Sequence, residues 1–320
     1  MIYCVGELLI DMFCLDRDTA LKDGEQFQKM PGGAPANVAV TIAKLGGQAA
    51  FAGKVGHDAF GDFLIETLNS YQVQTDMVKK DEQYPTTIAF VSLTADGERD
   101  FQFNRGADQN LRLEDEEISQ VIDSNVIHFG SATALLPGVL QETYFGLMVE
   151  AKREHKIISF DPNYRKDLWG GQIEGFVALC EKAIGYADFV KLSEEELALI
   201  AGTKDLANGA KKIHELGAKI VTVTLGKAGT FLSIGSEQAI IPSIKITNVD
   251  STGAGDAFVG AMLYQFEVND TKASDFSTVK KMVEFANIVG ASACTKVGSL
   301  SAIPSKEEVA LLLSGEVTGG

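Results

Sequence analysis

Short apolar runs alternate with helical patterns along most of the chain, and this alternation limits the folds open to it. The runs are rich in β-branched and other apolar residues, as strands buried on both faces are. They are Ile2–Val5, Ala49–Val55, Val126–Phe129, Ile157–Phe160, Phe189–Leu192 and Ile220–Leu225. The helical patterns between them include Ala36–Leu45, Phe60–Ser70, Val139–Glu154, Leu206–Leu216 and Val279–Cys294. The order predicts a three-layer α/β/α domain with a mostly parallel central sheet, which binds ligands at the carboxyl ends of its strands.

Two segments interrupt the alternation. Residues from about 12 to 30 alternate apolar and polar side chains without a helical period. Residues from about 85 to 105 have the pattern of a β-hairpin, with Asp96 and Gly97 at the turn. Neither segment has enough apolar residues for a core of its own, so we expect a small antiparallel sheet that leans on the main domain. The pattern leaves open whether this sheet is a lid over a ligand, a surface feature or a dimer contact.

Charge and composition exclude some classes of function. The formal net charge is −16, which argues against nucleic acid as a partner because phosphate contacts need clustered Lys and Arg. Membrane insertion is not expected, since no apolar run approaches the roughly 20 residues needed to span a bilayer. The first residues lack the basic region and cleavage site of a secretory signal. The scattered cysteines are expected to be free thiols, and together these features predict a cytoplasmic protein. They are Cys4, Cys14, Cys180 and Cys294.

The common nucleotide-binding and hydrolase motifs are missing from the sequence. No stretch matches G-x-x-x-x-G-K-[ST], no G-x-G-x-x-G follows the first expected strand, and no G-x-S-x-G elbow occurs. The four histidines show no metal-ligand spacing. A nucleotide bound by this chain must therefore be held by a different binding motif.

Residues 250–256 read DSTGAGD and precede an apolar helix pattern at Ala257–Phe266. We expect Ile240–Val249 to be the extended segment that leads into this turn. The first N–H groups of a helix lack partners within it, and the positive end of the helix dipole lies there. A glycine-rich first turn is therefore suited to bind a phosphate. For this motif taken alone, a plain helix cap with glycine for packing is the favoured interpretation.

The charged residues of this turn suggest two different roles. Gly253, Ala254 and Gly255 would form the anion-binding turn itself. Asp256 is placed to accept a proton from a substrate hydroxyl, as a general base must. Asp250 is placed to cap the turn or to help hold a cation.

A second glycine pair occurs in PGGAPAN at residues 31–37. Gly32 and Gly33 would form a tight turn, and Asn37 would lie at the start of the next helix. An amide offers both a donor and an acceptor, which suits a polyhydroxyl ligand, although helix capping is the plainer interpretation. Other polar or glycine residues follow expected strands, and together they suggest one shared cleft. They are Asp11, Asp161, Asn163, Arg165 and the segment TLGKAG at 224–229.

The DSTGAGD and PGGAPANVA motifs together resemble the two signatures of the ribokinase-like (PfkB) carbohydrate kinases. The resemblance runs in the family's usual order from GELLIDM to CTKVGSLSAIP, which is nearly the whole chain. The segments GGAPANVA, FGSATALL, DPNYRKDLW and FANIVGA are most similar to those of the fructokinases. The resemblance implies a single ribokinase-like kinase domain over residues 1–320, with a lid built from about 12–30 and 85–105.

The resemblance also implies roles for individual residues. Asp256 would be the general base, and Gly253, Ala254 and Gly255 would form the anion hole for the γ-phosphate of ATP. The residues on the sugar side would be Asp11, Gly32, Gly33, Asn37, Phe103, Arg105, Asn163 and Arg165. Of these, Arg105 and Arg165 would also face the phosphate. The residues on the nucleotide side would be Lys191, Ser193, Glu196, Thr224, Gly226, Gly229, Asn287 and Gly298.

The chain departs from the family pattern at one metal-related motif. Relatives commonly carry Asn-x-x-Glu, which helps to organise Mg²⁺ and phosphate, whereas the matching residues here are Ser193 and Glu196. Glu196 therefore keeps its implied indirect contact with Mg²⁺, and the contact made by the asparagine is in doubt. Lys191, just before this motif, is expected either to contact phosphate or to be a solvated surface lysine. Many relatives also use K⁺ near the anion hole, which here implies Asp250 and the backbone of Thr295–Gly298.

The substrate implied by the resemblance is D-fructose, phosphorylated to fructose 6-phosphate. The rival within the family is 2-keto-3-deoxygluconate kinase, whose members tend to place a tyrosine two residues before the lid arginine. Phe103 occupies that position here, which favours a neutral sugar, while ribose, tagatose 6-phosphate and inositol-pathway acids remain as other substrates. A rival of another class is a catalytically silent sugar-binding regulator. Relatives often dimerise through the lid, and we expect a homodimer of this kind.

Overall fold

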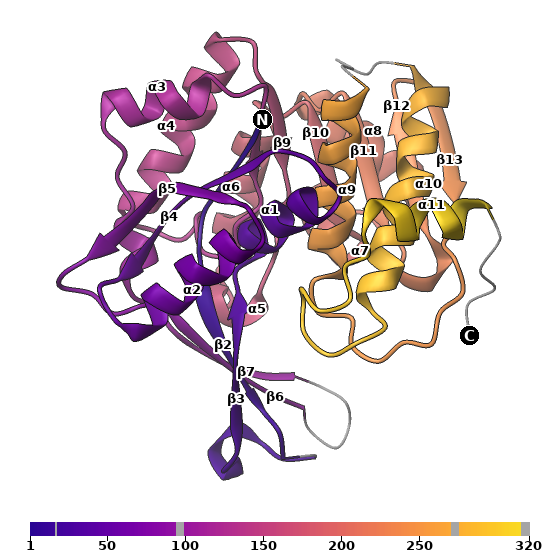
Figure 1. Cartoon of the computed structure of the whole chain (residues 1–320). Coiled ribbons are helices and arrows are strands. Elements are labelled where there is room, and N and C mark those ends of the chain that lie inside the picture. The colour runs from indigo at the N-terminus through magenta and orange to yellow at the C-terminus, as the bar shows by residue number, and fades with distance from the viewer. Residues whose placement is uncertain (17, 94–98, 270–274, 315–320) are drawn as a thin grey trace.

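The computed structural model describes residues 1–16, 18–93, 99–269 and 275–314, and it contains two β-sheets (Figure 1). A large sheet forms the centre of the molecule, and a smaller sheet projects from the bottom of the view. The expected turn at Asp96 and Gly97 lies outside the described residues. Within those residues, no helix is both long and apolar enough to cross a membrane.

The large sheet has nine strands, of which the central ones are parallel. All six apolar runs form strands in it, so the predicted parallel sheet is confirmed. Two further strands pair antiparallel at one edge. In spatial order the strands are β13 (Glu237–Ile241), β12 (Thr230–Ile234), β11 (Ile220–Thr224), β10 (Phe189–Ser193), β9 (Ile157–Phe160), β8 (Val126–Phe129), β1 (Ile2–Val5), β4 (Ala49–Gly56) and β5 (Gln74–Asp81).

Helices cover both faces of the large sheet, which confirms the three-layer architecture. In β1, Ile2 and Cys4 belong to one hydrophobic core, and Tyr3 and Val5 belong to the other, because successive side chains of a strand point to opposite faces. The first core also includes α1 (Ala34–Lys44), α2 (Ala59–Ser70), α9 (Ala254–Val268), α10 (Phe276–Ala293) and α11 (Lys306–Ser314). The second includes α3 (Asp115–Ile122), α4 (Val139–Arg153), α5 (Lys166–Trp169), α6 (Ile173–Ile184), α7 (Glu194–Ala201) and α8 (Leu206–Leu216).

The smaller sheet is built from the two segments that interrupt the alternation. Its strands, in spatial order, are β3 (Phe27–Gly32), β2 (Leu9–Cys14), β6 (Ile88–Leu93) and β7 (Arg99–Asn104). The outer pairs are antiparallel as expected, and the central pair β2–β6 is parallel. β2 follows β1 after only three residues, so the smaller sheet lies next to the carboxyl end of the central strand.

The expectation for Ile240–Val249 was wrong over most of its length. β13 ends at Ile241, and no helix or strand is formed again until α9 begins at Ala254. Pro242 follows the strand directly and has no N–H to continue a sheet ladder. The segment is instead held at its far end, where the backbone N–H groups of Val249 and Asp250 donate to the carbonyl of Cys294, at 2.8 and 3.2 Å.

Candidate active site

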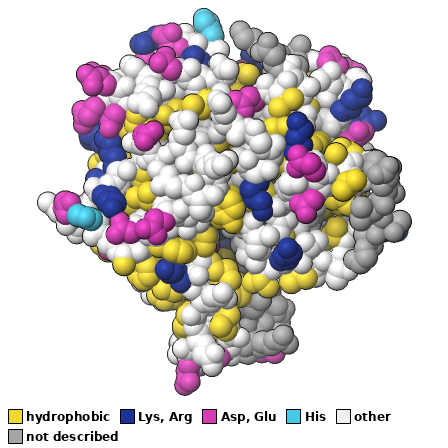
Figure 2. Space-filling view, in the orientation of Figure 1, with side chains coloured by type: hydrophobic (Ala, Val, Ile, Leu, Met, Phe, Trp, Pro, Cys, Tyr) yellow, Lys and Arg dark blue, Asp and Glu magenta, His cyan; other side chains and the backbone are white. Residues whose placement is uncertain are grey.

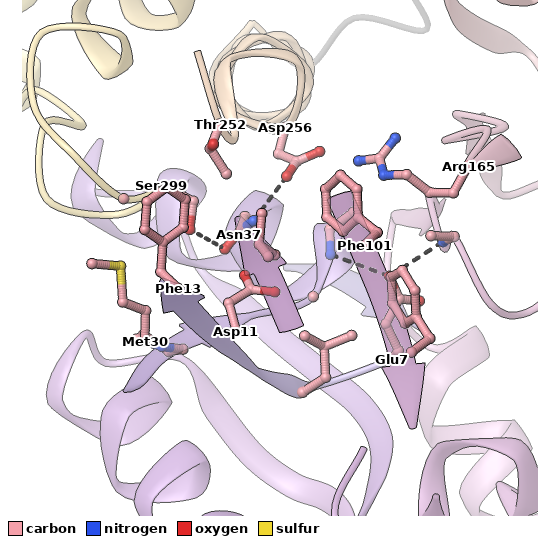
Figure 3. A pocket seen from close by; sticks show the side chains of 18 of the residues that line it. Glu7, Asp11, Phe13, Met30, Asn37, Phe101, Arg165, Thr252, Asp256 and Ser299 are labelled. Atoms are coloured by element: carbon pink, nitrogen blue, oxygen red, sulfur yellow. Dashed lines mark hydrogen bonds between the residues drawn. The ribbon is translucent and has the colours of Figure 1, made fainter. Parts of the chain in front are cut away.

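Two cavities meet at the carboxyl ends of the central strands. The first, which we call the Phe cavity, lies between the smaller sheet and the N-terminal ends of α1 and α9 (Figure 3). Its lining includes Asp11, Phe13, Met30, Gly33, Asn37, Val91, Phe101, Phe103, Arg165, Asp250, Thr252, Asp256, Gly298 and Ser299. The second, which we call the lysine cavity, is lined by Asn163, Tyr164, Arg165, Lys191, Ser193, Glu195, Glu196, Thr224, Gly255 and Asp256. Asp256 and Arg165 line both, so these two residues stand where the cavities meet.

Asp256 lies in the first turn of α9, as expected, and is buried. Asn37 in α1 donates from Nδ2 to Asp256 Oδ2 at 2.8 Å, and Ser299 donates from Oγ to Asn37 Oδ1 at 3.0 Å (Figure 3). Asn37 therefore does not cap its helix but holds the carboxylate of a helix that begins more than 200 residues later. The two glycine-containing motifs are thus joined by a hydrogen bond.

The environment of Asp256 changes its acidity. Burial raises the pKa of Asp256 from 3.8 to about 6, and the negative charge of Asp161 adds to the rise. The hydrogen bond from Asn37 and the positive charges of Arg165 and Lys191 oppose it. Figure 3 shows the guanidinium of Arg165 pointing toward Asp256. A carboxylate with a pKa near 6 is a stronger base than an exposed aspartate and is still ionised at neutral pH, as a general base must be.

The turn before Asp256 accepts only glycine at Gly253. This residue is the N-cap of α9 and has a left-handed backbone, with φ of 77°. A Cβ at this position would also lie 2.6 Å from the Cβ of Ser299, which is too close for two carbons. Gly253 and Ala254 line neither cavity among the described residues, so they shape the turn while Gly255 faces the lysine cavity.

Lys191 is a buried cation beside this turn, not a solvated surface lysine. Its ammonium donates to Asp161 Oδ2 at 3.0 Å. Burial alone would lower the pKa of Lys191, but the negative charges of Asp161, Glu196 and Asp256 outweigh burial and raise the pKa to about 12. A Cβ at Gly255 would lie 3.0 Å from Lys191 Nζ, so the glycine leaves room for the ammonium at the start of α9. The lysine cavity thus combines a helix N-terminus with a fixed positive charge, a combination suited to phosphate.

Ser193 and Glu196 form a capping box at the start of α7. Ser193 Oγ accepts from the N–H of Glu196 at 3.1 Å, and Glu196 Oε2 accepts from the N–H of Ser193 at 2.7 Å. Glu196 Oε1 also accepts from the N–H of Tyr164 at 2.9 Å, which ties the loop after β9 to the first turn of α7. Ser193 therefore caps α7, and both Ser193 and Glu196 line the lysine cavity.

Asp11 and Gly33 line the Phe cavity, and Gly32 lies beside Asp11 without lining it among the described residues. Gly32 packs against Asp11 so closely that a Cβ would overlap its carboxylate. Gly33 has a φ of 108°, and a Cβ there would overlap the carbonyl of Glu7. Asn163 lies on the other side, in the lysine cavity, with a left-handed φ of 46° that is stabilised by its N–H donating to Asp161 Oδ1 at 3.1 Å. Thr224 also lines the lysine cavity.

Arg105, Gly226, Gly229 and Asn287 line neither cavity among the described residues. Arg105 donates to the carbonyl of Thr133 at 3.0 Å and pairs with Asp108 at 3.4 Å. Asn287 accepts from Thr230 Oγ1 at 2.6 Å and donates to the carbonyl of Ile241 at 3.0 Å. Its amide therefore holds β12 against the segment after β13.

Asp250 supports the turn before α9. Its Oδ1 accepts from the N–H and the hydroxyl of Thr252, at 3.0 and 2.7 Å, and its Oδ2 accepts from the N–H of Gly298 at 3.0 Å. These contacts fit the capping role predicted for Asp250 and place Gly298 beside it. Across the described part of the chain, no group of three or more His, Cys, Asp or Glu is arranged to hold a metal ion.

Sequence reasoning missed several residues that the structure brings to the cavities. Phe13 and Phe101 line the Phe cavity beside Phe103, and Phe101 stacks on Phe103 with ring centroids 6.2 Å apart. Their spacing of two along β7 is a signal that both face the same side of the sheet. Glu7 also lines the Phe cavity, and nothing in its local sequence marks it out from a strand-end residue.

Comparison with known proteins matches nearly the whole chain to one family. Residues 1–306 match the model described as pfkB family carbohydrate kinase. Fructokinase-1 of Oryza sativa subsp. japonica is 35% identical over 316 residues, which cover 98% of this chain and 97% of that protein. The crystal structure of fructokinase from Vibrio cholerae O395, bound to fructose, ADP and calcium ion, matches with a TM-score of 0.85 and 32% identity over 98% of each chain. Fructokinase with bound ATP from Xylella fastidiosa matches with a TM-score of 0.86 and 34% identity, again over 98% of each chain.

Proposed function

The chain belongs to the pfkB family of carbohydrate kinases and is a sugar kinase, and from this premise we propose that it phosphorylates D-fructose with ATP to give fructose 6-phosphate. The observation that carries the proposal is the position of Asp256, a buried carboxylate on the wall shared by the two cavities. A sugar in the Phe cavity and a triphosphate in the lysine cavity would meet at this residue. Similarity to fructokinases, one of them bound to fructose and ADP, supports the choice of sugar.

In the proposed reaction, Asp256 takes the proton of the sugar hydroxyl. The hydroxyl oxygen then bonds to the γ-phosphorus, the bond from this phosphorus to the bridging oxygen breaks, and ADP leaves. Negative charge on the transferred group is met by the N–H groups at the start of α9, around Gly255, and by the ammonium of Lys191. Arg165 lines both cavities and would balance charge on the sugar side of the same group.

The Phe cavity favours a neutral sugar over an acid or a phosphosugar. Its lining contains the carboxylates of Glu7, Asp11, Asp250 and Asp256, against one guanidinium, that of Arg165. A ligand carboxylate or phosphate here would face net negative charge at short range. Asp11 and Asn37 supply acceptors and a donor for hydroxyl groups. The same charge balance weighs against 2-keto-3-deoxygluconate and tagatose 6-phosphate.

The lysine cavity fits a polyphosphate and its metal ion. Lys191, the Gly255 turn and Thr224 provide a cation, backbone N–H groups and a hydroxyl, as a triphosphate needs. We propose that Gly226, Gly229 and Asn287 shape the adjoining nucleotide surface and do not hold phosphate. Mg²⁺ commonly binds phosphates and water with few protein ligands, which agrees with the single indirect contact proposed for Glu196. Asp250 and the backbone near Gly298 are the proposed neighbours of a K⁺ ion.

We propose that the smaller sheet is a lid and that it also forms the dimer contact. Phe13, Phe101 and Phe103 line the cavity from its strands, so closure over a sugar would exclude water from the reaction. Figure 2 shows hydrophobic side chains gathered where this sheet meets the body, while acidic and basic side chains are dispersed over the rest of the face drawn. Leu15, just after β2, is 51% exposed.

The single domain over residues 1–320 and the cytoplasmic location stay predictions.

The test is an ADP-release assay with a panel of sugars and acids, run on the wild type and on Asp256→Asn. We expect the wild type to turn over with fructose, and with ribose and 2-keto-3-deoxygluconate far more weakly. The variant should lose at least a thousandfold in kcat while it still binds fructose. If the wild type binds a sugar but releases no ADP with any panel member, the chain is a silent sugar-binding regulator. If 2-keto-3-deoxygluconate is the best substrate, the charge argument is wrong.

A further inference from the structure

Glu7 is a buried carboxylate at the rear of the Phe cavity, and none of the assigned roles uses it. It follows β1 after one residue and is 1% exposed. Burial raises the pKa of Glu7, which shows that its surroundings oppose a charge there. A carboxylate so placed is costly unless every oxygen is hydrogen-bonded. The arrangement of its partners therefore indicates what the residue is for.

Four donors surround Glu7, and all belong to segments that form the cavity wall. Oε1 accepts from the N–H of Ala34 at 3.3 Å and from the N–H of Ala132 at 3.2 Å (Figure 3). Oε2 accepts from the hydroxyl of Ser131 in a very short hydrogen bond, and at 3.4 Å it shares the single hydroxyl proton of Thr133 with Asp108. Ala34 begins α1 next to Gly33, and Ala132 also lines the Phe cavity. Each oxygen of Glu7 is thus already hydrogen-bonded within the wall of the cavity.

The segments around Glu7 pack so closely that Gly6 and Gly33 leave no room for a side chain. A Cβ at Gly6 would lie 2.7 Å from the Cβ of Ser131 and 2.9 Å from Cγ of Pro35. Gly33, as described above, packs on the carbonyl of Glu7. The backbone of the sugar-side turn is thus held against the β1–β2 junction from both sides, and Glu7 is its hydrogen-bonding centre.

A second carboxylate extends this cluster to the base of the proposed lid. Thr133 donates from Oγ1 to Asp108 Oδ2 at 2.8 Å, and Thr87 makes a very short hydrogen bond to Asp108 Oδ1. Thr87 immediately precedes β6, and Arg105, which pairs with Asp108, immediately follows β7. The cluster therefore runs from the Gly33 turn to the ends of two lid strands.

We propose that Glu7 is a positioning residue for the sugar site: it fixes the Gly33–Ala34 turn and the Ala132 wall, and through Thr133 and Asp108 it joins them to the base of the lid. The proposal rests on the proposed function, because the affinity that it controls is that for the sugar. Glu7 touches neither substrate, so its loss should weaken sugar binding and leave the lysine cavity unchanged.

The test is Glu7→Gln in the full-length protein, compared with Asp188→Asn. An amide at position 7 must turn its NH₂ either toward the N–H groups of Ala34 and Ala132 or toward Ser131. Ser131 Oγ already accepts from the N–H groups of Thr133 and Ala134, so at least one hydrogen bond is lost at unchanged size in either case. Asp188 is the matched control, because its carboxylate accepts from the N–H of Ile158 at 3.0 Å at the opposite, amino edge of the sheet. We expect Glu7→Gln to raise the KM for fructose at least tenfold and to change the KM for ATP less than twofold, whereas the control changes neither.

Three results with the variants would overturn the inference. The first is a fructose KM within twofold of wild type in Glu7→Gln, and the second is an equal rise in both KM values, which indicates general damage. If Glu7→Gln does not fold, Thr133→Val removes the Thr133 hydroxyl that joins Glu7 to Asp108 and should raise the fructose KM about threefold, so an unchanged KM there is the third. If the wild type prefers another panel sugar, that sugar replaces fructose in the assay, and only the choice of substrate has failed. If it phosphorylates none, both proposals fail.

Discussion

The raised pKa of Asp256 predicts how the rate depends on pH and how Asn37 controls that dependence. If Asp256 is the base, kcat/KM for the sugar follows its ionised fraction. The rate should therefore be level above about pH 7 and fall as the pH drops through the folded pKa of about 6. An exposed aspartate, with a pKa of about 3.9, would leave the rate level down to about pH 5. The acid limb thus distinguishes the buried carboxylate from an ordinary one.

Asn37→Ala is the perturbation that tests the cause. The 2.8 Å hydrogen bond from Asn37 favours the charged form of Asp256 and lowers its pKa, so its loss should raise the pKa further. A hydrogen bond to a charged group contributes about 1.5–3 kcal/mol, and one pKa unit corresponds to about 1.4 kcal/mol. The acid limb should therefore move up by about one unit or more, to about pH 7 or above.

The assay is ADP release from pH 5 to 8.5 at saturating ATP and low fructose, with Asp188→Asn as a control for general damage. We expect the control to keep a midpoint of about 6. The reasoning is refuted if the wild-type rate stays level down to pH 5. It is also refuted if Asn37→Ala loses activity at every pH with an unmoved midpoint, because Asn37 would then act only by binding the sugar.

Three further predictions follow from the same site. Asp256→Asn should raise Tm at pH 8 and much less at pH 4. Ionisation of a buried acid whose pKa rises from 3.8 to about 6 destabilises the fold by about 3 kcal/mol well above pH 6, and this cost fades as the pH falls toward the unfolded pKa. A variant Tm equal to that of the wild type at pH 8, measured by scanning fluorimetry, would contradict the burial argument. Asp161→Asn should lower kcat about tenfold or raise the ATP KM about tenfold, because Lys191 loses its 3.0 Å ion pair, while the sugar KM stays within twofold of wild type. Equal effects on both KM values would argue against a phosphate role for Lys191. Gly253→Ala should lower the free energy of unfolding by about 1–3 kcal/mol and nearly abolish kcat, because the backbone at Gly253 is left-handed, with φ of 77°. A variant that is as stable and as active as wild type in thermal and turnover assays would show that this turn is not needed.

Much of the fold could be predicted because the central strands are buried on both faces. Such strands are apolar throughout, and all six predicted runs form strands in the large sheet. Three strands of this sheet were missed, and two of them, β5 and β13, are its edges. β5 reads QTDMVKKD, with several half-exposed or exposed residues, and β13 is mostly exposed, whereas β12 lies one strand in from the edge and is mostly buried. An edge strand with one solvated face has the composition of a loop, so hydrophobicity alone does not reveal it.

The two glycine-containing motifs of the candidate site could be predicted, because each is a short continuous segment that forms one turn. DSTGAGD and PGGAPAN were both placed at helix starts, and the structure brings them together. The roles came from the family resemblance, and the partners could not be predicted from spacing. Arg105 has the right residue type for a sugar site, yet its guanidinium lies at the base of the smaller sheet with Asp108. Glu7 was missed because its four donors lie 27 or more positions away along the chain.

The hydrogen bond between Asn37 and Asp256 has a consequence for how the molecule is made. It joins residues 219 positions apart, and Ser299 closes the same cluster from 262 positions away. During synthesis the N-terminal part of the large sheet can be complete while α9 and Ser299 are still untranslated, because chains fold from the N-terminus as they emerge. The carboxylate of Asp256 therefore reaches its partner only after nearly the whole chain has been made. A nascent or C-terminally truncated chain can be largely folded and still have no centre at which a phosphoryl group could be transferred.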